Sequence, residues 1–233
     1  MKRRQPMFRR SNHSFAADCV NGSPSGTIRP FGLLGWQVVA LLNSTNRSDS
    51  DRQVASGAVY LRYPAPGDYQ QWSDLREESR SFLVPWEPVW PIDDLTRSAF
   101  RRRLRRYARE IREEVAHPFF IFRSGDDALV GSCILSNIRR GVAQAGTLGY
   151  WIGQRYARNG YMSEAVRGVV SFAFDELSLH RVEAACLPTN EPSRKLLKRV
   201  GFAEEGMARA YLKINGRWED HLLFAIVSTD PRP

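Results

Sequence analysis

Residues 150–162 read YWIGQRYARNGYM, and residues 179–202 read LHRVEAACLPTNEPSRKLLKRVGF. In the first stretch, an apolar run that is typical of a strand enters a polar turn containing glycine, and a helical pattern begins directly after it. In the second stretch, a strand over 181–187 precedes a helix over 190–200, which Gly201 is placed to end. Strands that alternate with helices in this order predict one sheet with helices packed against it.

The rest of the chain, read outward from these stretches, adds further strands and helices. Toward the carboxyl end, the chain around Asn215-Gly216 forms a predicted hairpin with strands over 202–213 and 218–227, because this dipeptide is a strong signal for a tight turn. Toward the amino end, the pattern predicts strands over 59–63, 119–122, 129–138 and 144–152, a helix over 68–83, and an Arg-rich helix that starts near residue 93 and stops at Pro118. This order of elements predicts a mixed sheet with helices on both faces.

The composition limits the class of protein. The chain has 233 residues, of which 42% are hydrophobic and 25% charged, so a sizeable core can form in one domain with an appendage. No apolar run approaches the roughly 20 residues that span a bilayer, which argues against a transmembrane protein and a membrane partner. The cysteines Cys19, Cys133 and Cys186 are widely spaced, which excludes a disulfide framework and fits the reducing cytoplasm. No pair of histidines has metal-ligand spacing, so no metal is predicted.

Residues 1–56 differ from the rest of the chain. They hold eight Lys or Arg against three Asp, a net +5 of the total charge of +9. They show no sustained period, and their apolar run at 31–42 lies too far from the basic start, and lacks the cleavage site, for a signal peptide. We predict a poorly ordered basic extension over 1–56 and a domain over 57–229. Removal of residues 1–55 is expected to leave a folded, active protein.

The turn after residue 152 predicts a site for an anion. A short turn that opens a helix directs several backbone N–H groups at one point, and the helix start adds partial positive charge there. Arg155 and Arg158 can reinforce this attraction for a pyrophosphate. The turn can equally be an ordinary connection between a strand and a helix, whose glycine allows close packing.

Taken together, these motifs resemble the GNAT acetyltransferase superfamily. The resemblance rests on the turn Arg155-x-x-Arg158-x-Gly160, on Asn190-x-x-Ser193 opening a helix that ends in Gly201-Phe202, and on the run YLKINGRWEDH at 211–221, which is similar to the RimJ/RimL branch. It covers roughly residues 57–227. It implies an α+β fold, a three-layer α/β/α sandwich around a mostly antiparallel sheet of six to seven strands.

The function that this resemblance implies is transfer of an acetyl group from acetyl-CoA to an amine. For the RimJ/RimL branch, that amine is the N-terminal α-amino group, on alanine or serine, of a ribosomal protein. An acceptor that is a small-molecule amine, such as an aminoglycoside or a polyamine, is an alternative. A non-catalytic ribosome-assembly or RNA-binding module is another. The chain would act in the cytoplasm as a monomer or homodimer.

The resemblance also implies which residues bind acetyl-CoA, the cosubstrate. They are Tyr150, Trp151, Ile152, Arg155, Tyr156, Ala157, Arg158, Asn159, Gly160, Tyr161, Met162, Asn190 and Ser193. The strand residues would lend backbone groups to the pantetheine amides and the thioester carbonyl. This chain departs from the family at Arg158, where glycine is usual and allows a positive φ. The departure puts the geometry of the phosphate cradle in question.

The implied catalytic residues are Ser193, Asn190 and Tyr211. Ser193 would donate a proton to the CoA thiolate, and Asn190 would contact the pantetheine; both can instead cap their helix, and one side chain can do both. The base is left open among Tyr211, Glu183 and His221. A free α-amino group has a pKa near 7.7–8.0, so a weak base or a water relay is sufficient.

The acceptor side is expected between residues 77–88 and 209–218. The carboxylates Glu77, Glu78 and Glu87 can attract a basic peptide, or can simply form a solvated helix face. The Arg-rich helix over 101–112 can make a weak contact with ribosomal RNA. It can equally be a charged outer face in which Glu110, Glu113 and Glu114 pair with the arginines.

Overall fold

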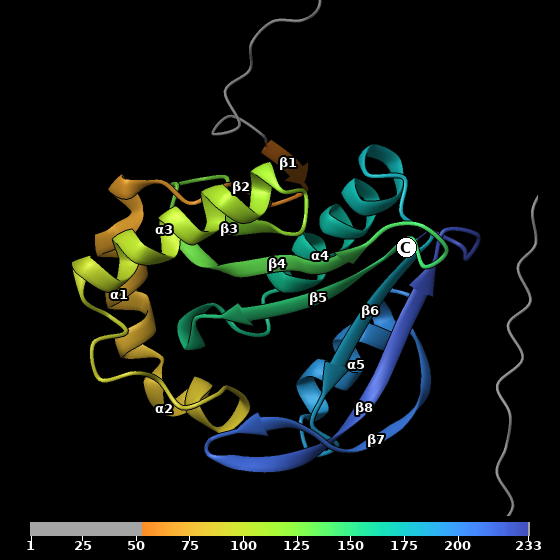
Figure 1. Cartoon of the computed structure of the whole chain (residues 1–233). Helices are drawn as coiled ribbons and strands as arrows, with labels where there is room; N and C mark the ends of the chain where they lie inside the picture. The colour runs from red at the N-terminus through yellow and green to blue at the C-terminus, as the bar shows by residue number, and fades with distance from the viewer. Residues whose placement is uncertain (1–52, 233) are drawn as a thin grey trace, which may run out of the picture. The chain divides into compact units, whose positions relative to one another are not determined.

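The computed structural model describes residues 53–232, whose helices and strands are labelled in Figure 1. The strands are β1 (Gln53–Ser56), β2 (Val59–Arg62), β3 (His117–Arg123), β4 (Leu129–Arg139), β5 (Ala145–Ile152), β6 (Arg181–Cys186), β7 (Ala203–Ile214) and β8 (Arg217–Val227). The helices are α1 (Tyr69–Glu78), α2 (Arg80–Leu83), α3 (Arg97–Arg112), α4 (Tyr161–Ser171) and α5 (Glu191–Arg199). Short 3₁₀ turns lie at Pro66–Asp68, Val84–Trp86 and Gln154–Tyr156, and a π-helical turn at Phe172–Glu176 extends α4.

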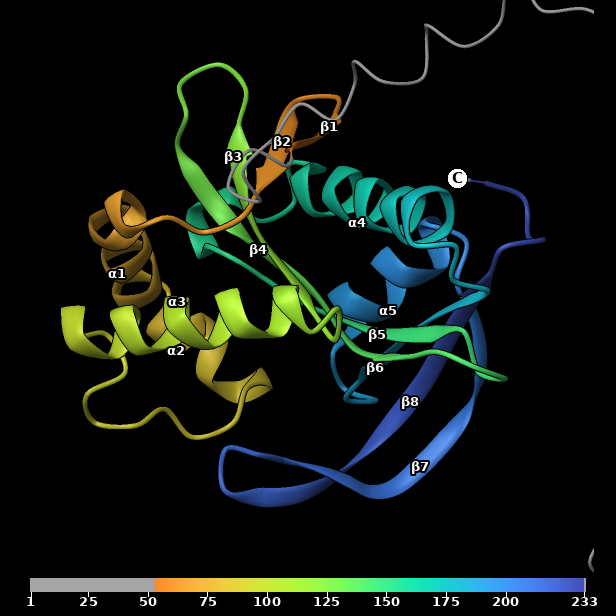
Figure 2. The ribbon, with the colours of Figure 1, turned by 45° about the horizontal axis from the view of Figure 1, so that its top comes forward.

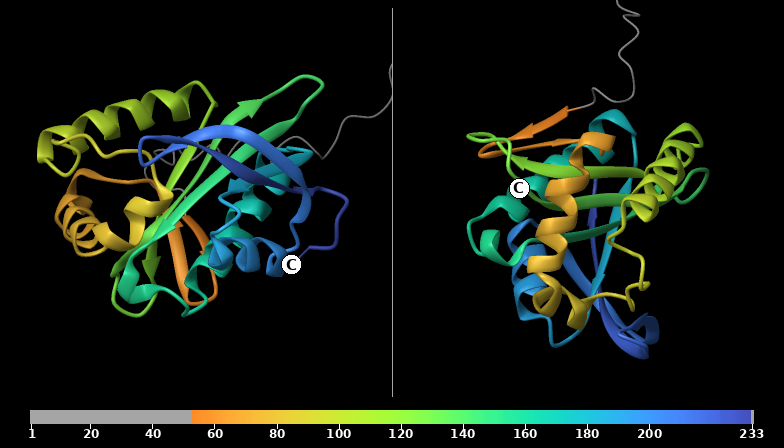
Figure 3. Two further views of the ribbon diagram at one scale, coloured as in Figure 1. Left: turned by 90° about the horizontal axis from the view of Figure 1, so that it is seen from below. Right: turned by 90° about the vertical axis from the view of Figure 1, so that its left-hand side faces the viewer.

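The described strands form one mixed sheet in the order β1-β2-β3-β4-β5-β6-β8-β7. Every neighbouring pair is antiparallel except β5 and β6, which run parallel. The predicted fold class, a mostly antiparallel sheet with helices on both faces, is therefore confirmed. Figures 2 and 3 show α1, α2 and α3 on one face of the sheet and α4 and α5 on the other.

The ordered domain begins earlier in the chain than the sequence predicted. Residues 53–56, which the sequence analysis assigned to the poorly ordered extension, form β1 and add one strand to the six or seven expected. β1 pairs with β2 in a hairpin whose turn contains Gly57 at φ 60°. Four residues are too few to show a period of two, so the sequence did not reveal this strand. The rest of the predicted extension, residues 1–52, lies outside the described residues.

The two amino-terminal helices also differ from expectation. The helix predicted over 68–83 breaks at Ser79, whose hydroxyl accepts a hydrogen bond from the Gln154 N–H at 2.9 Å, so the break ties α1 and α2 to the turn after β5. α3 begins later than predicted, after the N-cap Thr96, and ends at Arg112. Pro118 does not end this helix but lies in β3, at a position beyond the pairing with β2, where a missing N–H is tolerated.

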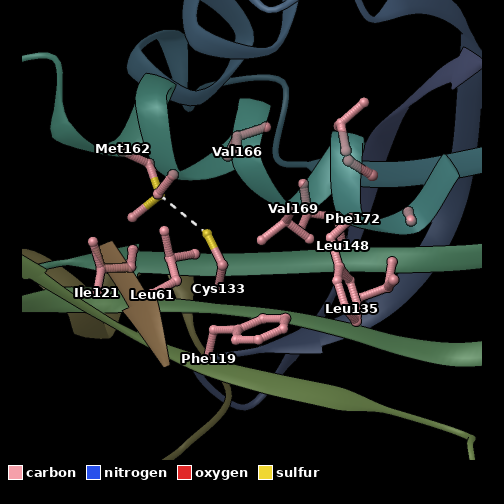
Figure 4. Packing of buried hydrophobic residues seen from close by; sticks show 14 of the residues in the cluster. Leu61, Phe119, Ile121, Cys133, Leu135, Leu148, Met162, Val166, Val169 and Phe172 are labelled. Atoms are coloured by element: carbon pink, nitrogen blue, oxygen red, sulfur yellow. Dashed lines mark hydrogen bonds between the residues drawn. The ribbon is translucent and has the colours of Figure 1, made fainter. Parts of the chain in front are cut away.

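The core between the sheet and α4 fixes where that helix begins. Figure 4 shows Val166 and Val169 of α4 facing side chains of the strands, among them Leu61 and Cys133. All four of these residues are fully buried. Burial of each aliphatic side chain contributes on the order of 1.5–3 kcal/mol, so sliding of α4 along the sheet is strongly disfavoured. The first turn of α4 therefore stays beside the end of β5.

Candidate active site

The sheet opens between its two parallel strands. Pairing of β5 with β6 covers only Ala145–Thr147 against Arg181–Glu183, and beyond it the two strands diverge, as Figure 1 shows. The Gly153 N–H bonds to the Val130 carbonyl at 2.9 Å, so in β5 the alternate residues 148, 150 and 152 direct their N–H and C=O groups away from β4. Residues 150 and 152 lie beyond the pairing with β6, so their backbone groups face the opening. Such groups need a partner, and a bound ligand can provide it.

The turn after β5 presents a second set of backbone groups. Within the turn, the Tyr156 N–H bonds to the Gly153 carbonyl and the Ala157 N–H to the Gln154 carbonyl. The Asn159 side chain donates to two carbonyls of the turn, at 3.2 Å each, and keeps its shape. In contrast, the N–H groups of residues 158–163 have no acceptor within the described part of the chain, and α4 has no side-chain cap. Free donors and the positive end of α4 therefore meet at one point.

Arg158 adopts the conformation that glycine usually supplies to this turn. Its φ is 65°, and Gly160 follows at φ 85°. A Cβ added to Gly160 would meet no other atom within 4 Å, so the space in front of the helix start is open. The Arg158 side chain is exposed and makes no ion pair or hydrogen bond within residues 53–232. The turn with its open front and free cation fits a phosphate group.

The other residues predicted for the cofactor contribute unequally. Arg155 pairs with Glu78 at 3.1 Å, so part of its charge is already offset. The side chains of Tyr156 and Met162 are buried, which leaves their backbone for a ligand. Tyr156 lies against the guanidinium groups of Arg155 and Arg123.

Asn190 and Ser193 form the expected helix cap. The Asn190 Oδ1 accepts a hydrogen bond from the Ser193 N–H at 3.1 Å, with Pro192 in the first turn of α5. Both residues are half-buried and lie at the helix end that borders the opening. The cap fixes the backbone of Ser193. A contact of either residue with a cofactor stays a prediction.

A contact between Tyr150 and Ser193 was not foreseen from the sequence. The Tyr150 hydroxyl lies 2.7 Å from the Ser193 hydroxyl, which joins β5 to α5 across 43 residues of chain. Burial raises the pKa of Tyr150, and the hydrogen bond to Ser193 opposes this effect. Burial likewise raises the pKa of Cys186 at the end of β6, and Ser193 again acts in the opposite direction. Tyr150 lies in a mostly apolar strand. The sequence of such a strand does not indicate which side chain the tyrosine hydroxyl contacts.

The three candidate bases differ in their surroundings. Tyr211 is 46% exposed on β7, next to an irregular stretch of pairing, and its ring meets that of His221 edge-on at 5.7 Å. His221 is buried, and its Nδ1 lies 3.0 Å from the Glu219 carbonyl. Glu183 forms ion pairs with Arg139 and Arg181 on the sheet surface, which makes it a poor base. Tyr211 is therefore the most accessible of the three.

The carboxylates expected to attract a basic acceptor already have cationic partners. Glu77 pairs with Arg80, Glu78 with Arg155, and Glu87 with Arg76. Each pair offsets the negative charge on its carboxylate. Attraction of a basic peptide by these three carboxylates stays a prediction, and their ion pairs weaken it.

Arg76 forms a buried cluster that the sequence did not predict. It is 6% exposed, binds Glu87 through two hydrogen bonds of 2.8 Å, and lies over the rings of Trp90 at 3.9 Å and Trp151 at 5.0 Å. The backbone carbonyl of Glu87 accepts from the Asn215 N–H at 2.9 Å, so the tip of the β7–β8 hairpin is tied to the same loop. Because arginines in a polar helix are usually exposed, the sequence does not indicate that Arg76 is buried.

The described residues contain no group of three or more His, Cys, Asp or Glu that could hold a metal ion. Among the same residues, no helix has the length and apolar character needed to cross a membrane.

Comparison with known proteins identifies the chain as an N-acyltransferase. Residues 58–203 match the family described as acetyltransferase (GNAT) domain, and the chain belongs to this family of N-acetyltransferases. It is 37% identical to the Bacillus subtilis (strain 168) protein named "Probable N-acetyltransferase YjcK", over 74% of this chain and 95% of that protein. It is 35% identical to the [ribosomal protein uS5]-alanine N-acetyltransferase of Escherichia coli (strain K12), over 78% of this chain and 93% of that enzyme.

A solved structure agrees with this assignment. Mycobacterium smegmatis RimJ in complex with CoA-disulfide superposes with a TM-score of 0.71 at 31% sequence identity, covering 76% of this chain and 86% of RimJ.

Proposed function

We propose that the protein transfers the acetyl group of acetyl-CoA to the N-terminal α-amino group, on alanine or serine, of a ribosomal protein. The observation that carries this proposal is the opening between β5 and β6 beside the uncapped start of α4. The similarity to the Escherichia coli enzyme that acts on ribosomal protein uS5 supports the choice of acceptor. We also propose that the reaction takes place in the cytoplasm and that the chain acts as a monomer or homodimer.

In this proposal, the two sets of free backbone groups bind different parts of acetyl-CoA. The N–H groups of residues 158–163, with Arg158 beside them, would bind the pyrophosphate of CoA. The groups of Tyr150 and Ile152 that face the opening would bind the pantetheine amides and the thioester carbonyl. Binding through fixed backbone donors requires little reorganisation when charge develops on the carbonyl oxygen.

The chemistry needs a neutral amine and a protonated leaving group. An α-amino group with a pKa near 7.7–8.0 is partly neutral at cellular pH, so it can attack without a strong base. Tyr211, exposed on β7, is the proposed residue for the proton that the amine releases. As the C–N bond forms and the C–S bond breaks, Ser193 would supply a proton to the sulfur, and the Asn190 cap holds the Ser193 backbone for this task.

The acceptor peptide would approach between the loop that follows α2 and the β7–β8 hairpin. The hydrogen bond from Asn215 to Glu87 closes one end of this space. Because Glu77, Glu78 and Glu87 are neutralised by arginines, we expect the peptide to be held by backbone and apolar contacts more than by its positive charge.

The proposal is tested with labelled acetyl-CoA and purified ribosomal proteins, followed by mass spectrometry of the labelled chains. We expect one ribosomal protein to gain an acetyl group on an N-terminal alanine or serine, and CoA to bind in calorimetry. A parallel panel contains aminoglycosides and polyamines. Label that appears only in the small amines would overturn the ribosomal acceptor. Absence of CoA binding would favour the non-catalytic ribosome-assembly or RNA-binding alternative.

A further inference from the structure

Tyr150 connects the two elements that border the opening. It lies on β5 at a position where the backbone faces the opening, and its hydroxyl reaches Ser193 at the start of α5, at 2.7 Å. Its cross-strand partner on β4 is the fully buried Cys133. The Cys133 Sγ lies 3.6 Å from the Met162 Sδ of α4. The Tyr150 side chain therefore lies on the face of the sheet that carries α4, and its hydroxyl contacts the start of α5.

The hydrogen bond has a preferred direction. A partly buried phenol needs a partner for its proton, and a serine hydroxyl can accept one hydrogen bond while it donates another. When Tyr150 donates to Ser193, the proton of Ser193 is left for another acceptor, which is either the Cys186 sulfur or a ligand. Burial raises the pKa of Tyr150, so the phenol keeps its proton throughout the neutral range.

We propose that Tyr150 is a positioning residue for acetyl transfer, which acts through Ser193. This inference rests on the proposed function. Tyr150 donates a hydrogen bond to the Ser193 Oγ, which orients the Ser193 proton toward the sulfur of the cosubstrate. A hydroxyl that accepts a hydrogen bond is also a stronger donor, because the charge that develops on its oxygen is stabilised.

The step balances without any further reactant. The amine nitrogen forms a bond to the acetyl carbon, the C–S bond breaks, and the sulfur takes the Ser193 proton. The hydrogen bond from Tyr150 stabilises the negative charge on the Ser193 Oγ during this transfer. The proton released by the amine passes through Tyr211 to solvent, and solvent returns a proton to Ser193. Tyr150 keeps its own proton throughout.

A purely structural contact between β5 and α5 would behave differently. It would change the stability of the fold or the affinity for CoA, but it would not act through the Ser193 hydroxyl. The variants Tyr150→Phe, Ser193→Ala and the double variant separate these roles. Tyr60→Phe is the matched control, because it also removes a phenol that makes one hydrogen bond, here to Asp127 at 2.9 Å, outside the site.

We expect Tyr150→Phe to lower kcat roughly tenfold, with the dissociation constant of CoA within about twofold of wild type. Ser193→Ala should lower kcat at least as much, and the double variant should equal Ser193→Ala, because Tyr150 has nothing to position once the hydroxyl is gone. Tyr60→Phe should keep the wild-type kcat. Each variant is assayed with whichever amine the wild type acetylates, so that failure of the ribosomal acceptor leaves this test intact.

A second measurement needs no acceptor. The thiolate absorbance of bound CoA is followed against pH, and a donor beside the sulfur lowers the pKa of the bound thiol. We expect that pKa to rise by about 0.5–1 unit in Tyr150→Phe and in Ser193→Ala, and to stay unchanged in Tyr60→Phe. An unchanged kcat in Tyr150→Phe, losses that multiply in the double variant, or an unchanged thiol pKa would each overturn the inference. If the wild type binds no CoA, the proposed function and this inference fall together.

Discussion

Arg158 combines a strained backbone with a free cation. A left-handed conformation disfavours any residue with a Cβ by roughly 1–2 kcal/mol, so Arg158 at φ 65° is held against its own preference. Arg158→Gly should remove this strain and raise the free energy of unfolding by about 0.5–1 kcal/mol. It should also weaken CoA binding about three- to tenfold, because the guanidinium no longer attracts the phosphates. Chemical denaturation and calorimetry measure the two effects.

Arg158→Ala separates charge from strain, since it removes the guanidinium and keeps the Cβ. Its affinity for CoA should fall as in Arg158→Gly, and the salt dependence of binding should become shallower in both, but its stability should stay near that of wild type. Equal CoA affinity in all three proteins would show that Arg158 does not face the cosubstrate.

Gly153 allows close packing where β5 enters its turn. A Cβ at this position would lie 2.3 Å from the Leu75 Cδ1, and Leu75 is 1% exposed and cannot move aside. Gly153→Ala should therefore lower the free energy of unfolding by about 1–3 kcal/mol. Gly149→Ala is the control on the same strand, because its Cβ would meet no atom within 4 Å, and it should be neutral or stabilising. Thermal melting of both variants tests this difference, and equal melting temperatures would contradict it.

At the scale of elements, α3 carries two kinds of arginine. Arg102, Arg103 and Arg106 form ion pairs with acidic side chains, whereas Arg101, Arg105, Arg109 and Arg112 are exposed and have no ion pair within residues 53–232. Of the three glutamates expected to pair with this helix, only Glu110 does so. The unpaired four recur every three or four residues and so form one stripe, about 16 Å long. We propose that this stripe contacts ribosomal RNA during the reaction.

The stripe predicts a specific salt dependence. Each phosphate contact with single-stranded RNA contributes about −0.7 to the slope of log K against log salt. Arg105→Gln with Arg109→Gln should therefore make the slope shallower by about 1.4, measured by fluorescence anisotropy with a ribosomal RNA fragment. Arg102→Gln with Arg106→Gln removes the same charge from paired positions and should change the slope less. Equal changes in the two variants would show that only net charge matters.

Sequence reasoning succeeded where structure depends on neighbouring residues. The turn, the start of α4, the Asn190 cap and the Asn-Gly hairpin all follow from side chains within a few positions. It failed where the partner is distant in the chain, as for the break at Ser79, which faces Gln154, and for Arg76, which is buried only because Trp151 and the loop after α2 come together. The hydrogen bond between Tyr150 and Ser193 belongs to the same group. Such contacts depend on tertiary structure, which local patterns do not encode.

For the whole molecule, two buried thiols and the partly buried Tyr150 phenol contribute to the change of stability in alkali. Burial raises the pKa of Cys133, Cys186 and Tyr150 in the folded protein. The folded state therefore keeps protons that the unfolded chain releases above its ordinary values of about 8.5 for cysteine and 10 for tyrosine. The contribution of these groups is fully present below about pH 8.5 and is lost as pH rises. Each group can remove at most about 1.4 kcal/mol of stability per pH unit.

The melting temperature should accordingly be level between about pH 7 and 8 and should fall between about pH 9 and 11. Cys133→Ala deletes a fully buried thiol, so the free energy of unfolding of this variant should fall less steeply as pH rises. At neutral pH that free energy should be lower than in wild type, because a small cavity forms. Val130→Ala is the control, since it truncates a fully buried residue of the same strand that does not titrate, and it should lower the melting temperature without changing the slope. Denaturant titrations under reducing conditions at each pH measure the slopes. Parallel curves for wild type and Cys133→Ala would mean that the thiol is not protected from ionising by the core, and that the packing of α4 on the sheet is looser than its buried side chains require.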